Sequence, residues 1–163
     1  MMIRIFTPQD KEQLCNLFAS LIEGHKEYIS HGELQMGIAT DSNTLAPNFK
    51  EIWLQYLERQ YTDPQTLIRI YENDENGALA GFIIFGIRDD GGSPYGVIYD
   101  LGVLPGFREK GTGSLLVRTA LDYFREQGVE SCFLESGVNN HSAHHFFEQF
   151  GFRQVSCVFR NKL

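Results

Sequence analysis

The first third of the chain alternates between a short strand pattern and longer helical patterns of apolar residues. Residues 3–6 alternate briefly. From Pro8 to about Ser30 the apolar residues recur every three or four positions, which predicts a helix with one buried stripe. That stripe consists of Leu14, Leu17, Phe18, Leu21 and Ile22. The periodicity is lost from His31 to Asn48, which predicts a long irregular connection, and it returns from Phe49 to Tyr61, which predicts a second helix.

Three strands are predicted in the middle of the chain. The segments Thr66 to Tyr71 and Ala78 to Ile87 flank a polar turn that ends in Asn76-Gly77, a pattern typical of a β-hairpin. A further strand is predicted from Tyr95 to about Leu104. Alternation along this strand places two sets of side chains on opposite faces: Val97, Tyr99, Leu101 and Val103 on one, and Ile98, Asp100 and Gly102 on the other.

The last third of the chain has the predicted order helix, strand, helix, strand. The segments are Gly111 to Gln127, Ser131 to Glu135, Asn140 to Phe150 and Phe152 to Lys162. The first of these helices makes the strands at Tyr95 and Ser131 a parallel crossover, and ligands in such units bind beyond the carboxyl ends of the strands. The whole order describes an α/β protein with a mixed sheet covered by helices, in one domain from residue 1 to residue 163.

Composition narrows the class of protein. With 163 residues and 42% hydrophobic content, we expect a soluble globular fold, and no window approaches the roughly 20 apolar residues of a membrane span. The three cysteines are far apart in the sequence, which argues against a disulfide framework. Together with an apolar N-terminal run too short for a secretory signal, this predicts a cytoplasmic location. The formal charge of −7 argues against binding to nucleic acid or to anionic membranes and mildly favours cationic substrates such as amines.

The most informative segment is Arg108-Glu109-Lys110-Gly111-Thr112-Gly113, which lies between a predicted strand and the start of a predicted helix. Free amides at a helix N-terminus carry positive partial charge, and glycines let an anion approach the backbone, so the segment predicts a phosphate-binding turn. Two nucleotide-binding motifs fit less well. A P-loop needs a lysine where Thr112 stands, and a dinucleotide fingerprint needs a third glycine where Leu116 stands.

The string from Val103 to Gly113 resembles the acetyl-CoA-binding motif of the GNAT superfamily of N-acyltransferases. Arg108, Gly111 and Gly113 fill its characteristic positions. A second segment, Asn140 to Phe152, resembles the helix of that superfamily that combines Asn, Ala, an aromatic residue and Gly-Phe. The resemblance implies an α/β fold of the mixed α+β type: a mostly antiparallel twisted sheet of about six to seven strands, with the parallel crossover at the cofactor site and about four flanking helices.

The resemblance also implies the ligands. Acetyl-CoA would be the acyl donor and an amine of a small molecule or peptide the acceptor, in a ternary complex, and a homodimer is plausible on the same ground. The implied cofactor contacts are backbone groups of Leu101 and Val103, the amides of Arg108, Glu109, Lys110, Gly111, Thr112, Gly113 and Ser114, and the residues Asn140 and Phe147. The acceptor site would be framed by the irregular connection from His31, by the second helix with Trp53 and Tyr56, and by the last two strands.

Acyl transfer to an amine requires a neutral amine, a donor for the developing oxyanion and a proton for the leaving thiolate. By resemblance the Val103 amide is the oxyanion donor, and either Asp100 or Glu135, on strands flanking the cleft, accepts the amine proton. Phe147 occupies the position where many family members carry a tyrosine that protonates the thiolate, so His144 is the candidate substitute. Coenzyme A is also a tolerable leaving group by itself, because thiols titrate near about 8.5.

Two further readings of the residues are weak. His141, His144 and His145 share a helix, but no cysteine or acidic partner is placed beside them, so no metal site is expected. Cys132 lies on a strand predicted to be buried and has no identifiable base, so it is not expected to be a nucleophile. Three functions stay open: an amine acetyltransferase, a non-catalytic sensor that binds acyl-CoA, and a P-loop-like nucleotide binder.

Overall fold

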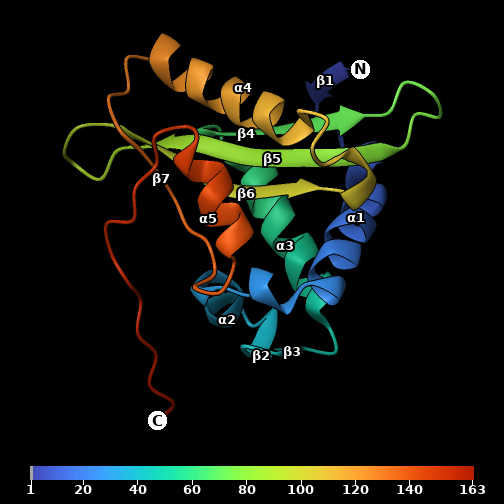
Figure 1. The fold of residues 1–163 in the computed structure, drawn as a ribbon, viewed down its shortest axis with the longest axis vertical. Coiled ribbons are helices and arrows are strands. Elements are labelled where there is room, and N and C mark those ends of the chain that lie inside the picture. Colours follow the sequence, from blue (N-terminus) through green and yellow to red (C-terminus); the bar gives the residue numbers. More distant parts are fainter. Residues whose placement is uncertain (1) are drawn as a thin grey trace.

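The computed structural model describes residues 2–163 and contains a five-stranded sheet in the order β1-β4-β5-β6-β7 (Figure 1). The strands are β1 Met2–Ile5, β4 Thr66–Glu72, β5 Leu79–Arg88, β6 Tyr95–Val103 and β7 Cys132–Leu134. All neighbours are antiparallel except β6 and β7, which run parallel. The predicted mixed, mostly antiparallel sheet is therefore confirmed, with five strands in place of the expected six to seven.

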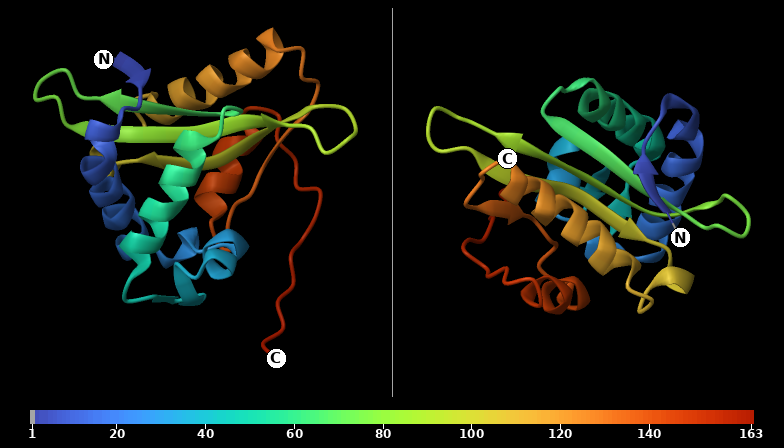
Figure 2. Two further views of the ribbon diagram at one scale, coloured as in Figure 1. Left: turned by 180° about the vertical axis from the view of Figure 1, so that it is seen from behind. Right: turned by 90° about the horizontal axis from the view of Figure 1, so that it is seen from above.

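Helices cover both faces of this sheet (Figure 2). Helix α4, Thr112–Glu126, packs on one face against β5 and β6, whereas α1, Lys11–Gly24, and α3, Phe49–Thr62, pack on the opposite face. The shorter helices are α2, His31–Met36, and α5, His141–Glu148, and α5 lies on the β7 side of the sheet. No helix within residues 2–163 is long and apolar enough to cross a membrane.

Each face of the sheet has its own core. On one face Leu116, Ala120 and Phe124 of α4 are buried at four-residue spacing, which is the apolar stripe of an amphipathic helix. On the other face the Trp53 ring of α3 stacks on Phe18 of α1, with ring centroids 4.4 Å apart. Close packing of such large side chains fixes α3 and α4 relative to the sheet. These two helices carry much of the candidate site.

The N-terminal helix is shorter than predicted. Helix α1 covers Lys11–Gly24, with one 3-10 turn before it at Pro8–Asp10 and another after it at Lys26–Tyr28. The following segment, predicted to be irregular, contains α2 and a small hairpin of β2, Ala39–Asp41, and β3, Thr44–Leu45. These two strands form a sheet of their own.

Helix α2 starts with a capping box that the sequence contains. The Glu33 carboxylate accepts hydrogen bonds from the Ser30 backbone N–H at 2.7 Å and from its hydroxyl at 2.6 Å. The helix ends at Gly37, whose φ of 82° is left-handed. A Ser followed three residues later by Glu is a recognised helix start. A helix of six residues is too short to show a helical period of apolar residues. The capping pattern was therefore the only sequence signal that could have predicted α2.

Strand β6 contains a β-bulge. Ile84 of β5 pairs with Asp100, but the next residue of β5 pairs with Ile98, so Tyr99 is an extra residue in the ladder. Tyr99 and Asp100 therefore both face the α1 and α3 side, whereas Ile98 and Leu101 both face α4. The strict alternation predicted for β6 is wrong here, because an extra residue breaks the period of two.

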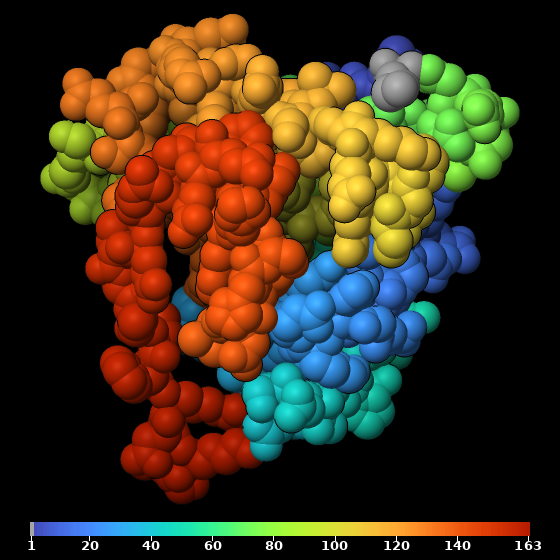
Figure 3. Space-filling model, in the orientation of Figure 1, coloured from blue at the N-terminus to red at the C-terminus, as the bar shows by residue number. Residues whose placement is uncertain are grey.

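The final strand predicted from Phe152 to Lys162 does not form. Within the described chain this segment pairs with no strand. Residues 153–163, called the C-terminal segment below, are exposed along their whole length. Figure 3 shows the segment standing away from the rest of the molecule over much of that length. A strand pattern becomes a strand only when another strand pairs with its backbone groups.

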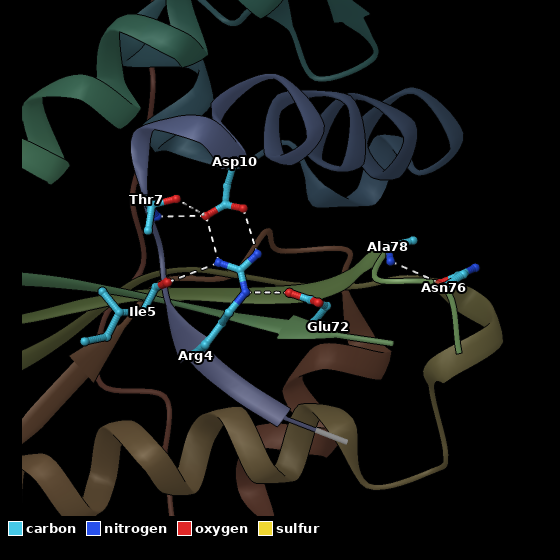
Figure 4. Close-up of polar contacts among 7 residues, drawn as sticks. All are labelled: Arg4, Ile5, Thr7, Asp10, Glu72, Asn76 and Ala78. Carbon is cyan, nitrogen blue, oxygen red and sulfur yellow. Dashed lines mark hydrogen bonds and ion pairs between the residues drawn. The ribbon is translucent and has the colours of Figure 1, made fainter. Parts of the chain in front are cut away.

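An ion cluster fixes the first strand to its surroundings (Figure 4). Arg4 of β1 donates to both carboxylate oxygens of Asp10, at 2.8 and 2.9 Å, and to Glu72 of β4 at 2.5 Å. The hydrogen bonds from Arg4 lower the pKa of Asp10 to about 2. Because this pKa is depressed, the pair stabilises the fold above about pH 4, and that stability is lost as the pH falls toward 2.

Candidate active site

Strands β6 and β7 separate after a short parallel pairing. Only Gly96, Val97 and Ile98 of β6 pair with β7, which ends at Leu134, whereas β6 continues to Val103. The far half of β6 therefore has no neighbour on its β7 side. This gap at the carboxyl ends of parallel strands is where α/β units bind their ligands.

Backbone groups of β6 point into this gap. The Leu104 N–H donates to the Ala80 carbonyl of β5 at 2.9 Å. Because strand amides alternate in direction, the N–H groups of Leu101 and Val103 point to the opposite, unpaired side. The Val103 carbonyl points away from β5 as well, because it accepts a hydrogen bond from Arg108 Nε at 3.0 Å. These are the two residues whose backbone the resemblance assigned to the pantetheine arm, and that assignment stays a prediction.

The turn before α4 has the geometry of an anion nest. Glu109 has a φ of 59° and Gly111 a φ of 82°, and Glu109 is the only non-glycine residue with positive φ among residues 2–163. Alternation of left-handed and right-handed residues gathers backbone N–H groups around a concavity. Because the first bond of α4 runs from Leu115 N–H to the Gly111 carbonyl, the amides of residues 112–114 have no partner within the helix.

Side chains around the turn also fit a phosphate group. Thr112 is 2% exposed, and its hydroxyl has no hydrogen-bond partner among the described residues. A buried unpaired hydroxyl is costly, so an anion at this turn would satisfy it. The Arg108 guanidinium instead lies over the Tyr28 ring, 5.9 Å from its centroid, and Lys110 lies over Phe107. The backbone and Thr112 are therefore the groups best placed to hold the pyrophosphate of a coenzyme.

Helix α5 approaches the same turn through Phe146. A Cβ placed on Gly113 would lie 3.2 Å from Phe146 Cζ, whereas Phe147 packs edge-on against Phe152, with centroids 5.9 Å apart. Asn140 is buried and caps α5, its side-chain oxygen accepting from Ala143 N–H at 3.3 Å. Sequence reasoning missed Phe146, although it is adjacent to the residue selected.

Asp100 lies beside the gap on the side of α1 and α3. Burial of the carboxyl and the negative charge of Glu33 raise its pKa from 3.8 to about 7. A long hydrogen bond from Trp53 Nε1 at 3.4 Å and one from the Leu101 backbone oppose this increase. A carboxyl with a pKa near neutrality can accept and return a proton at physiological pH.

Two more polar groups, Tyr56 of α3 and Glu33 of α2, lie near Asp100. Tyr56 of α3 is buried, and its pKa is raised by burial and by the charges of Asp100 and Glu33. The three side chains come from β6, α2 and α3, which are far apart in sequence. The sequence pointed to Tyr56 and Trp53 as acceptor-site residues, but nothing in it indicated Glu33 beyond its role in capping α2. Together with Trp53 they form an acidic cluster, defined here as Glu33, Asp100, Tyr56 and Trp53.

The other two expected catalytic residues are held by neighbours. Glu135 follows β7 and accepts a hydrogen bond from the Gly32 amide at 3.2 Å. Its carboxylate also lies 2.5 Å from the Ser30 hydroxyl oxygen, whose one proton it shares with Glu33, and it contacts His31. It therefore joins α2 to the end of β7. His144 Nε2 lies 2.9 Å from the Gly137 carbonyl, which orients the ring toward the loop before α5.

The remaining candidate groups do not form a reactive centre. Within residues 2–163, no group of three or more His, Cys, Asp or Glu side chains could hold a metal ion. His141 and His144 contact each other edge-on, and His145 is on an exposed turn of α5 beside Glu148. Burial raises the pKa of the Cys132 thiol, which disfavours its nucleophilic thiolate form.

Fold and site together define an α/β protein in which a helix start with amides unpaired in the helix lies beside a split pair of parallel strands. The sequence profile of the acetyltransferase (GNAT) family matches residues 37–152, and the chain belongs to this family. The resemblance seen in the two sequence segments is thereby confirmed.

Comparisons with individual proteins agree. The chain is 36% identical over 100 residues to the mycothiol acetyltransferase of Propionibacterium freudenreichii, a match that covers 61% of the chain and 31% of that protein. It is 33% identical over 95 residues to the streptothricin acetyltransferase of Streptomyces lavendulae, with 58% and 48% covered. The match thus spans less than half of each relative. The fold is similar to that of an aminoglycoside 6'-N-acetyltransferase from Acinetobacter haemolyticus, with a TM-score of 0.71, 17% identity, and 100% and 99% of the two chains covered.

Proposed function

We propose that this protein is an N-acetyltransferase that transfers the acetyl group of acetyl-CoA directly to a primary amine within a ternary complex. The observation that carries the proposal is a juxtaposition of three features at one end of β6: the anion nest before α4, the amides of Leu101 and Val103 that point away from β5, and the carboxyl of Asp100. Membership of the acetyltransferase family supports it. Three unpaired cysteines support a cytoplasmic location.

The cosubstrate would be held mainly by backbone. Amides of residues 109–114 and the Thr112 hydroxyl would bind the pyrophosphate, and the Leu101 and Val103 backbone would bind the extended pantetheine arm. Acetyl-CoA supplies the acyl group as an activated thioester. The Val103 N–H would donate to the thioester oxygen and stabilise the negative charge that develops there.

Asp100 would act as the proton acceptor for the incoming amine. An amine attacks only when neutral, and a carboxylate with a pKa of about 7 is basic enough to accept its proton near neutral pH. As the new C–N bond forms and the C–S bond breaks, the amine proton passes to Asp100 and the electron pair to sulfur. A carboxyl of pKa about 7 is a stronger acid than a thiol of pKa about 8.5, so returning that proton to the departing sulfur is favourable.

The acceptor would be a cationic amine. The charge of Glu33 raises the pKa of Asp100, and an ammonium group near both carboxyls would relieve that repulsion. Tyr56 adds a buried hydroxyl next to both carboxyls. The relative named streptothricin acetyltransferase and the aminoglycoside acetyltransferase of similar fold are consistent with an amine acceptor.

One observation favours a second candidate, a domain that binds acyl-CoA without catalysing transfer. Phe147 has no hydroxyl and packs against Phe152, so the position that often donates a proton in this family cannot do so here. A sensor of this kind would use the same nest and the same edge of β6. It would need neither Asp100 nor the rest of the acidic cluster.

Ligand-induced stabilisation followed by turnover tests both candidates. Acetyl-CoA or CoA at about a hundredfold excess over Kd should raise the melting temperature by about 5 °C or more, because each binds only the folded state, whereas ATP should not. Thiol release should then be measured with mono- and dicationic amines. Turnover with any amine supports the transferase; binding without turnover supports the sensor; a shift with ATP alone would contradict both.

A further inference from the structure

Helix α2 is held in place by polar contacts more than by a buried face. None of its six residues is buried, and a helix this short is marginal without tertiary contacts. Leu34 and Met36 are only partly buried against the core. The position of α2 therefore depends strongly on the groups that bind its ends.

Glu135 binds the first turn of α2 from a distant part of the chain. Its carboxylate accepts a hydrogen bond at 3.2 Å from the Gly32 N–H, one of the amides that have no partner within the helix. It also lies 2.5 Å from the hydroxyl oxygen of Ser30, the N-cap residue, and it contacts His31. A negative charge is stabilising at a helix N-terminus. Glu135 thus acts as a helix cap that another element supplies.

The loop after β7 meets the chain before α2 at a second point. The chain that leaves β7 runs to α2 before it turns back to α5 (Figure 1). Gly137 in this loop is buried, and a Cβ placed on it would lie 2.5 Å from the Glu27 carbonyl oxygen and 3.1 Å from that of Ile29. The two segments therefore pack backbone to backbone, which brings Glu135 to the start of α2.

The same helix start leads to the acidic cluster. The Glu33 carboxylate accepts from the Ser30 N–H and lies 2.6 Å from the Ser30 hydroxyl oxygen, so two carboxylates meet at one hydroxyl. Through α2 the charge of Glu33 comes near Asp100 on β6 and Tyr56 on α3. A displacement of α2 would move Glu33 away from both of them.

We propose that Glu135 is a positioning residue, which holds α2 against the end of β7 and so keeps the Glu33 carboxylate beside Asp100. Its purpose rests on the proposed function, in which Glu33 and Asp100 together receive the ammonium group of the acceptor. The groups that face Asp100 are Glu33 from α2 and Trp53 and Tyr56 from α3. Glu135 acts on Asp100 through α2.

The first test compares two substitutions of Glu135 in the full chain. Glu135→Ala removes the cap, whereas Glu135→Gln removes the charge but keeps an oxygen that accepts the same hydrogen bonds from Ser30 and Gly32. Amide hydrogen exchange at residues 31–36 should be faster in Glu135→Ala than in Glu135→Gln, and exchange in α3 should be equal in the two. Equal exchange of α2 in both variants overturns the proposal.

The second test follows the Asp100 carboxyl by carbon-13 NMR through a pH titration, which requires no turnover. Its midpoint should lie at lower pH in Glu135→Ala than in the parent protein, because the charge of Glu33 withdraws, and should not move in Glu135→Gln. Glu33→Gln, which keeps the capping pattern, should also lower the midpoint.

The double variant shows whether Glu135 acts through Glu33. Glu135→Ala should lower the Asp100 midpoint less in the Glu33→Gln background than in the parent protein, because the charge that it displaces is already absent. The same shift in both backgrounds, or a shift in Glu135→Gln as large as in Glu135→Ala, overturns the proposal.

Kinetics then tests the purpose of the contact. Glu135→Ala should raise KM for the amine roughly fivefold, because the ammonium group loses one of its two carboxylates, whereas Glu135→Gln should keep the KM of the parent protein. An unchanged KM in Glu135→Ala overturns a role in receiving the acceptor. If the parent protein turns over no amine, the proposed function is wrong, and the exchange and NMR comparisons still decide whether Glu135 positions Glu33.

Discussion

At the level of single residues, the chemistry of Asp100 is decided by groups distant in sequence. Its carboxyl is shielded from water, faces the charge of Glu33, and receives only a long hydrogen bond from Trp53. Shielding and like charge both favour the protonated form. The sequence identifies Asp100 as a residue on the strand beside the cleft. The sequence does not indicate that the pKa of Asp100 is raised, because Glu33 comes near Asp100 only through the position of α2 in the folded chain.

The pH dependence of the reaction tests this assignment. With Asp100 as proton acceptor, kcat/KM should rise with pH and bend near pH 7, where the carboxyl ionises. The variant Asp100→Asn should lose activity on the order of 10²- to 10⁴-fold and should lose the bend near pH 7. The measurement is kcat/KM from pH 5.5 to pH 9 with a saturating concentration of acetyl-CoA.

Two controls separate chemistry from stability in that experiment. Glu135→Gln changes the other carboxyl near the cleft, and it should keep the bend near pH 7, because Glu135 is engaged by α2. Because the folded-state pKa of Asp100 is raised, its ionisation destabilises the fold as the pH rises from about 4 to 7. Asp100→Asn should therefore be no less stable than the parent protein at pH 8. A bend that survives in Asp100→Asn excludes Asp100 as the titrating group.

At the level of elements, helix α4 offers an internal comparison of its two ends. Gly111 before the helix and Gly128 after it both have left-handed φ, at 82° and 72°, and neither has an atom within 4 Å of the position of an added Cβ. An alanine at either position meets the same backbone strain, about 1–2 kcal/mol. Only Gly111 lies at the anion nest, so the two substitutions separate stability from ligand binding.

The expected result is a loss of cofactor affinity at one end only. Gly111→Ala should weaken acetyl-CoA binding on the order of tenfold, because the new methyl group and the strained turn disturb the amides that receive the pyrophosphate; that loss equals about 1.4 kcal/mol. Gly128→Ala should bind acetyl-CoA as the parent protein does, with a similar loss of stability. Calorimetric titration and urea unfolding of both variants provide the measurement. Equal affinities in the two variants would place the pyrophosphate elsewhere.

The helices and strands that could be predicted from the sequence are the long ones and those with a defined turn. Helices α3 and α4 and the hairpin of β4 and β5 were predicted within a few residues, because each carries several periods of apolar residues or a defined turn. Helix α2 was missed because it is short. The bulge at Tyr99 was missed because an inserted residue leaves no mark on composition. The approach of Phe146 to Gly113 depends on how α5 packs, which no local pattern records.

At the level of the whole molecule, the two edges of the sheet differ in how they are protected. Strand β1 is held by the ion cluster of Arg4, whereas β7 has only three residues and a half-exposed Phe133. A pattern of alternating residues at 153–162 predicted a strand that would have covered an edge. That prediction fails because a strand forms only where a neighbouring strand pairs with its backbone, and the C-terminal segment pairs with none among the described residues.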